Sequence, residues 1–377
     1  MQPLEFPSGN DGTLTSARSL LLDAIERRVF PGCAYGVWAA GAAIACEGLG
    51  RFTYAEDSAP AKSETAQSEI VQAETVYDVA SLTKVVATTM MAMLLFQRGQ
   101  LDLEMPLGEL LPGFVVGRSG QQSSWARAVT LRHLLAHNSG LPGYQPLFRQ
   151  AGNATELLRA CLTMTLEAEP GSRAEYSDHG FILLGKALEV LAGSDLAAWT
   201  SREIFSPLGM HHTRFCPPAS ERPRIPPTEI DSTLRHRVIQ GEVQDEHAYR
   251  MQGVGGHAGL FSNVPDLLRL SAALLAPDEE GLLHRQTLNL FSQRQLPEGS
   301  SRALGWDTPS TPSSSGTHFS SDSIGHLGYS GCSLWIDRQA QIAVVLLTNR
   351  TWPDRSQDAI RQLRPVFHDA VRSSLLL

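Results

Sequence analysis

The pattern of apolar and polar positions predicts a helical middle of the chain and two ends that carry β-strands. Near the start, apolar residues recur at helical spacing between Thr15 and Val29, which predicts an amphipathic helix. Two β-prone runs, Cys33 to Ala39 and Ala42 to Gly50, follow with a tight connection and predict a hairpin. Val85 to Gln97 is almost wholly apolar and rich in helix formers, so we expect a buried helix there.

The same pattern predicts short helices through the middle of the chain and a strand–strand–helix sequence at its end. The predicted helices are Thr130 to His137, Thr155 to Leu162, Phe181 to Leu191 and Asp195 to Ile204. The predicted strands are Cys332 to Asp337 and Gln341 to Thr348, and a last helix is expected from about Asp354 to Arg372. Polar, Gly-rich or Pro-rich composition predicts loops at 51–75 and 117–124 and a linker or surface excursion at 217–230.

Strands at both ends that enclose a helical middle predict an α/β (α+β) sandwich fold. We expect one antiparallel sheet built from both termini, with an all-α domain inserted between its halves. The expected α/β domain comprises residues 14–80 and 250–377, the mostly helical domain comprises 81–249, and 1–13 form a flexible tail. A catalytic cleft is expected where the two domains meet.

Composition narrows the choice of partners and compartment. The 377 residues are 42% hydrophobic and 19% charged, with a formal net charge of −8, which argues against nucleic acid or an anionic membrane as the main partner. Five scattered cysteines show no metal-ligand or disulfide spacing. We find no apolar run of membrane-spanning length and no signal peptide, so the chain as written is expected to be cytoplasmic, or periplasmic if an export signal was removed.

Ser81 and Lys84 form the first candidate for chemistry, at the start of the apolar helix. Residues three apart lie on the same helix face, so the Ser81 hydroxyl and the Lys84 amine can meet. A serine hydroxyl needs a base to become a nucleophile, and a buried lysine with a lowered pKa can serve as one. Taken alone, the four-residue spacing favours an N-capping serine and a surface lysine, because such matches arise by chance in most chains of this length.

Two further segments complete the candidate chemistry. Tyr176 and Asp178 lie just before a predicted helix, and a tyrosine beside a lysine can exist partly as phenolate and act as a general base. The glycine-rich segment 323–331 contains His326, Gly328 and Tyr329, and leads into a predicted strand. Glycines at a strand edge let a substrate approach the backbone and free an N–H for an oxyanion. A half-buried tyrosine and a hairpin turn are the structural alternatives.

These three segments, in this order, resemble the serine β-lactamase and penicillin-binding-protein family. The likeness is to the branch with class C β-lactamases, D-Ala-D-Ala carboxypeptidases and related esterases. Ser81 to Lys84 matches the Ser-x-x-Lys motif of that family. Tyr176-Ser177-Asp178 matches its Tyr-x-Asn element except at the last residue, and His326-Leu327-Gly328 matches its Lys/His-Thr/Ser-Gly element at two positions of three. The likeness covers roughly residues 14–375 and implies a β-lactamase/transpeptidase-like fold.

By that resemblance, Ser81 is the nucleophile and Lys84 with Tyr176 forms the base pair. The backbone N–H groups of Ser81 and Tyr329 would form the oxyanion hole, and His326, Gly328 and Asp178 would contact the substrate. No cofactor is expected. His133 and His137 have a zinc-compatible spacing, but the metalloprotease glutamate is absent, so no metal site is expected there.

The departures from the family motifs bear on the substrate. His326 and Leu327 remove the permanent cation and the hydroxyl with which many relatives hold a substrate carboxylate. Asp178 replaces an amide that can donate a hydrogen bond, and its charge would hold Lys84 protonated. We therefore expect a serine hydrolase acting on a small acyl substrate, with esterase, amidase or carboxypeptidase activity favoured over efficient β-lactamase activity. The alternative is a penicillin-fold binder or sensor that acylates slowly or not at all.

Overall fold

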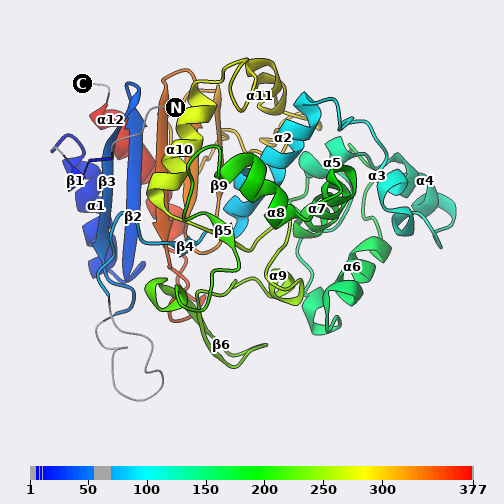
Figure 1. The fold of residues 1–377 in the computed structure, drawn as a ribbon, viewed down its shortest axis with the longest axis horizontal. Coiled ribbons are helices and arrows are strands. Elements are labelled where there is room, and N and C mark those ends of the chain that lie inside the picture. The colour runs from blue at the N-terminus through cyan, green and yellow to red at the C-terminus, as the bar shows by residue number, and fades with distance from the viewer. Residues whose placement is uncertain (1–5, 8, 11, 55–68, 376–377) are drawn as a thin grey trace.

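An antiparallel sheet of six strands forms one side of the molecule, and most helices lie on the other side (Figure 1). The computed structural model describes residues 6–7, 9–10, 12–54 and 69–375. The strand order is β1-β3-β2-β11-β10-β9, so both ends of the chain contribute to one sheet. The strands are β1 Gly9–Asn10, β2 Gly32–Ala39, β3 Ala42–Gly50, β9 Ser323–Leu327, β10 Ser333–Asp337 and β11 Ile342–Thr348. The predicted fold class is confirmed.

The predicted hairpin is formed by β2 and β3, in a register that pairs Ala39 with Ala42 at the turn. Strand β1 extends the sheet beyond β3, with Gly9 opposite Cys46 and Asn10 opposite Ala45. The expected flexible tail at 1–13 is therefore wrong for these two residues, because their backbone pairs with an edge strand. Of the predicted loop at 51–75, residues 55–68 lie outside the described residues, and Arg51 pairs with Ile70 across the gap.

Helices α1 Thr15–Glu26 and α12 Ile360–Ser374 pack side by side on the outer face of the sheet. Their apolar stripes bury Leu21 and Ala24 against Phe367 and Val371, in one core with Trp335 of β10. Helix α12 begins six residues later than the sequence predicts. The preceding segment instead carries Arg355, whose guanidinium binds Glu229 and Glu246 across the chain.

The inner face of the sheet is covered by α10 Val264–Leu275, which packs on β2 and β11 (Figure 1). This approach is close because Gly36 has no side chain. A Cβ added there would lie 2.4 Å from Cγ1 of Val264 and 2.8 Å from Cδ1 of Leu268. Beyond α10 lie the remaining helices: α2 Met90–Gln97, α3 Leu107–Leu110, α4 Gly120–Ala128, α5 Leu131–Leu135, α6 Ala154–Thr163, α7 Asp178–Ala192, α8 Leu196–Thr200, α9 Glu246–Arg250 and α11 Arg285–Phe291.

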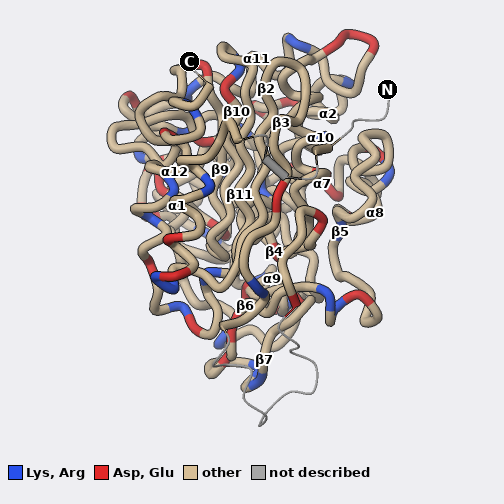
Figure 2. Tube along the Cα trace, turned by 90° about the vertical axis from the view of Figure 1, so that its left-hand side faces the viewer, with Lys and Arg blue, Asp and Glu red and all other residues tan. Residues whose placement is uncertain are grey.

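One of the sequence predictions for the middle of the chain is wrong. Residues 117–124 were expected to form an exposed loop, but α4 begins within them. Side chains hold this helix in place: Arg118, just before it, donates to carbonyls of Leu162 and Met164, and Gln122 donates to that of Leu166. The segment 217–230, expected to be a linker or a surface excursion, leads into β6 Pro227–Asp231. This strand pairs with β7 Arg237–Gln240 in a hairpin that projects from one end of the molecule in both views, as a surface excursion would (Figures 1 and 2).

The stretch Ala80–Gln97 is long and apolar enough to cross a membrane, but the fold buries 83% of it. Such burial is typical of a core helix, so this stretch is weak evidence for a membrane span. Figure 2 shows acidic and basic residues interspersed along the described chain. The 31 basic and 39 acidic residues of the chain nearly balance, which gives the modest net charge of −8.

Candidate active site

Ser81 lies in a tight helical turn, Ala80–Leu82, between the short strand β4 Tyr77–Asp78 and the buried helix. The turn continues as a π-helical segment, Lys84–Thr89, and then as α2, so the predicted helix is present but irregular at its start. Wide helical turns of this kind often occur at functional sites. Ser81 lines a cavity of about 630 Å³ between the sheet and the helices.

The backbone before Ser81 is strained and held by several side chains. Ala80 has a φ of +48°, a left-handed conformation that costs a residue with a Cβ about 1–2 kcal/mol. Its N–H donates to the Asp78 carboxylate at 2.8 Å, and its carbonyl accepts from the Thr83 hydroxyl at 2.6 Å. The Ser330 hydroxyl donates to the Asp78 carbonyl at 2.8 Å. The side chains of the neighbouring Asp78 and Thr83, together with that of the distant Ser330, therefore fix the backbone around the serine.

Lys84 is completely buried, and its amine contacts Ser81 as the spacing predicts. The Nζ atom donates to Ser81 Oγ at 3.0 Å, to Asp178 Oδ1 at 2.6 Å and to the main-chain carbonyl of His257 at 3.1 Å. Burial acts to lower the pKa of Lys84, but the adjacent Asp178 carboxylate and the Tyr176 phenol together more than offset it, and the net pKa is raised. Lys84 is therefore protonated at rest, as the charge of Asp178 led us to expect.

Tyr176 completes the group around Ser81. The Lys84 amine lies 4.9 Å from the centroid of its ring, and Tyr176 lines the same cavity as Ser81. Its ring packs against His137, with centroids 4.6 Å apart, and the Arg302 guanidinium lies 5.2 Å from the ring centroid. Burial raises the pKa of Tyr176 further than the Lys84 charge lowers it, so the phenol is neutral at rest. This direction opposes the resting phenolate that the sequence suggested.

The end of β9 lies directly against the serine turn. A Cβ on Gly328 would lie 2.5 Å from the Val79 carbonyl oxygen, so only glycine allows this approach. The Gly328 carbonyl accepts from the buried Arg364 at 2.7 Å. Within the described residues, the backbone N–H groups of Ser81 and Tyr329 donate to no other backbone group, which leaves both available to an oxyanion.

His326 is buried and neutral. Its Nδ1 lies 2.8 Å from the Leu327 carbonyl, and burial lowers its pKa to about 3. It therefore supplies no cation to a substrate, as the sequence predicts. Sequence reasoning missed the cations that do line the cavity, because no local spacing marks them. They are Arg302, Arg350, Arg355, Arg361 and Arg364.

Of these cations, Arg302 is the one placed over the ring of Tyr176. Its nearest acidic partner is Asp307, at 3.7 Å, which is too long for a direct hydrogen bond. Arg350 is engaged with the carbonyls of Tyr329 and Gln357. Arg302 therefore brings a positive charge close to Tyr176 and His326, where the family motif has lost one.

The sequence and the fold are similar to those of known proteins over most of their length. The Beta-lactamase family model matches residues 17–366. N-acetylmuramyl-L-alanine amidase of Bacillus subtilis (strain 168) is 31% identical over 322 residues, which cover 77% of this chain and 70% of that protein. A putative D-alanyl-D-alanine carboxypeptidase of Salmonella typhi is 32% identical over 303 residues, 73% of this chain and 69% of that protein.

Among solved structures, EstCE1, a hydrolase with promiscuous acyltransferase activity, superimposes with a TM-score of 0.76 at 21% identity. The match covers 96% of this chain and 99% of that one, which shows a shared fold. The family match extends over both parts of the sheet and the helices between them. The chain is therefore a member of the Beta-lactamase family.

Proposed function

We propose that this protein is a serine hydrolase that forms an acyl-enzyme on Ser81 and cleaves amide or ester bonds of a small acyl substrate. The observation that carries the proposal is the 3.0 Å contact between Lys84 Nζ and Ser81 Oγ, at the wall of an open cavity that Tyr176 also lines. A nucleophile beside a buried base is the arrangement that covalent acyl transfer requires.

In the proposed reaction, Ser81 Oγ bonds to the acyl carbon and its proton passes to the Lys84–Tyr176 pair. The negative oxygen that results is held by the N–H groups of Ser81 and Tyr329. When the bond to the leaving group breaks, the pair returns the proton to the departing nitrogen or oxygen. Water then hydrolyses the acyl ester and regenerates Ser81.

The resting charges set the pH at which this reaction runs. Because Lys84 is protonated and Tyr176 is neutral at rest, the pair must lose one proton before it can act as a base. Both pKa values are raised, so kcat/KM should increase as the pH rises into the alkaline range. The two groups interact directly, so the observed value belongs to the pair.

The names of the relatives support amide substrates with a free carboxylate. One relative is named an amidase and the other a carboxypeptidase, and the latter name implies a carboxylate next to the scissile bond. In this chain the neutral His326 and Leu327 cannot supply the cation, whereas Arg302 carries a charge beside Tyr176. Arg302 is therefore our candidate for the residue that binds that carboxylate.

A second candidate is a protein that binds acyl compounds but turns them over slowly. The ion pair of Lys84 with Asp178, at 2.6 Å, favours it because the pair holds the lysine in its protonated form. Two probes distinguish the candidates: a fluorescent phosphonate and a fluorescent penicillin, with any adduct located by mass spectrometry.

Labelling of Ser81 by the phosphonate alone indicates an esterase or amidase, and labelling by both probes indicates a penicillin-interacting enzyme. Absence of any adduct on Ser81, in a protein whose circular dichroism shows a folded chain, would refute the hydrolase proposal. The Ser81→Ala variant is the control for labelling elsewhere.

A further inference from the structure

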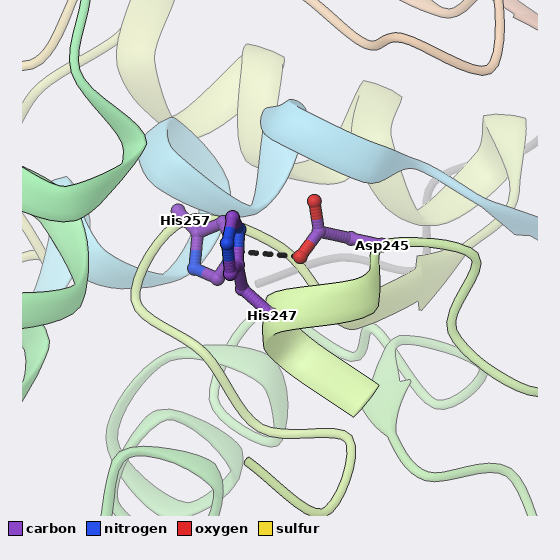
Figure 3. Close-up of side chains that lie close together, drawn as sticks. All are labelled: Asp245, His247 and His257. Atoms are coloured by element: carbon purple, nitrogen blue, oxygen red, sulfur yellow. Dashed lines mark hydrogen bonds and ion pairs between the residues drawn. The ribbon is translucent and has the colours of Figure 1, made fainter. Parts of the chain in front are cut away.

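Three potential metal ligands, Asp245, His247 and His257, lie close together in the fold (Figure 3). Asp245 lines the cavity, and the main-chain carbonyl of His257 accepts from the Lys84 amine. Asp245 caps the start of α9, with its Oδ1 accepting from the Ala248 N–H at 2.8 Å, and His247 follows in the same helix. His257 comes from the glycine-rich segment between α9 and β8 Leu260–Ser262. One ligand atom of each residue lies within 4.8 Å of the other two.

Of these three residues, His247 has the strongest need for a bonding partner. It is fully buried, and neither ring nitrogen has a hydrogen-bond partner among the described residues. Rings surround it instead, with the centroids of Tyr144 and Phe148 each 5.6 Å away. Leaving a buried polar group unpaired costs about 1–3 kcal/mol, and an imidazole has two such groups. The neighbouring His179 differs, because its two nitrogens face carbonyls at 3.0 and 3.2 Å.

The other two residues supply the remaining ligand atoms. His257 Nε2 lies 2.7 Å from Asp245 Oδ1, while His257 Nδ1 is buried without a partner in the described part of the chain. All hydrogen bonds found for the Asp245 carboxylate within the described residues are made by Oδ1. Since Asp245 lines the cavity, its Oδ2 is available to a ligand there.

We propose that Asp245, His247 and His257 bind one divalent transition-metal ion of the zinc class, with a fourth position open to the cavity. Two imidazoles and one carboxylate form a ligand set that suits such ions. Bonds of about 2.0–2.1 Å in a tetrahedron place ligand atoms about 3.4 Å apart. The His257–Asp245 pair must therefore open slightly and His247 must approach by about an ångström or more, which are side-chain movements.

The position of this site links it to the chemistry of Ser81. The main-chain carbonyl of His257 is one of the three acceptors of the Lys84 amine. An ion bound by the His257 ring would therefore be held by the same residue whose carbonyl orients the lysine. The cavity that contains Ser81 reaches this group at Asp245, which lines it. The site itself does not depend on the proposed hydrolase activity, because binding is measured directly.

The test is a titration of the chelator-treated full-length protein with Co²⁺, followed by visible absorption. Four-coordinate cobalt absorbs far more strongly than the hydrated ion, and Zn²⁺ should displace it. We expect one equivalent of cobalt per chain, and at least a tenfold weaker affinity in His247→Gln and in His257→Gln. The matched control is the double variant His211→Gln/His212→Gln, which removes an exposed adjacent pair that could bind metal adventitiously.

Thermal unfolding without metal shows whether each variant is folded, and the spectrum of the unmodified protein gives a result that needs no variant. Three outcomes would overturn the proposal. They are a spectrum of hydrated cobalt only, loss of the bound-cobalt spectrum in the His211/His212 variant instead, or unchanged affinity in folded His247→Gln and His257→Gln.

Discussion

Replacing Gly328 by alanine is a direct test of how the sheet positions the nucleophile. The added Cβ would lie 2.5 Å from the Val79 carbonyl oxygen and 3.0 Å from Cys332 Cβ. Carbon atoms that are not bonded are most stable about 3.5–4.0 Å apart, so the strand and the turn must separate by roughly an ångström. The first contact is a backbone atom, which cannot rotate away as a flexible side chain would.

The displaced backbone is the one that carries Ser81, two residues after Val79. Overpacking of this kind costs about 1–3 kcal/mol of stability. A misplacement of about 1 Å at a catalytic group can cost about a hundredfold in rate. We therefore expect Gly328→Ala to remain folded with a lower melting temperature, and to lose about 10- to 100-fold in kcat/KM on a p-nitrophenyl ester of a short acid.

The control is Gly152→Ala, because the nearest atom to its added Cβ is the end of the Glu156 side chain, at 3.4 Å. The free energy of unfolding of this variant should lie within about 0.5 kcal/mol of that of the unmodified protein, and its activity should be unchanged. Rates are measured with the folded fraction determined by circular dichroism and the number of active sites titrated with a phosphonate. If Gly328→Ala keeps kcat/KM within about twofold of the unmodified protein, the contact between β9 and the serine turn does not position Ser81.

Three further substitutions test the proposed roles of site residues. Ser81→Ala should abolish ester turnover and leave the melting curve intact, and more than about a tenth of the original kcat/KM would exclude Ser81 as the nucleophile. Asp178→Asn removes a negative charge beside Lys84 and should lower the pKa of the base pair, moving the acidic limb of the kcat/KM profile to lower pH. An unmoved limb would show that Asp178 does not control this proton. Arg302→Gln should raise KM for an acyl substrate that carries a carboxylate by about tenfold and leave a neutral ester unaffected. Equal losses on both substrates would indicate a structural role for Arg302.

Local sequence pattern was sufficient where an element's own residues determine its conformation. The β2–β3 hairpin and the strands β10 and β11 carry runs of apolar residues with turn residues between them, and their positions were predicted within one or two residues. The contact between Lys84 and Ser81 follows from helical spacing alone. These features need no information from distant parts of the chain.

The missed features all depend on contacts between distant residues. Helix α4 is held by hydrogen bonds from Arg118 and Gln122 to backbone carbonyls more than forty positions away. Every residue has a backbone carbonyl, so the sequence does not indicate which of them will accept such a bond. Strand β9 contains Gly325 and His326 and is defined by its pairing with β10. Arg302 and the metal-ligand candidates reach the cavity from segments that no short motif connects to Ser81.

The three contacts of the Lys84 amine determine which of its hydrogens can be lost. An ammonium group has three N–H bonds, and here each one points at a different acceptor: Ser81 Oγ, Asp178 Oδ1 and the His257 carbonyl. After deprotonation, a lone pair directed at the carboxylate or the carbonyl would be repelled. The two remaining N–H bonds therefore keep donating to the Asp178 carboxylate and the His257 carbonyl, and the lone pair of Nζ faces the serine hydroxyl. Loss of one proton thus converts the position facing Ser81 from donor to acceptor without any rotation of the side chain.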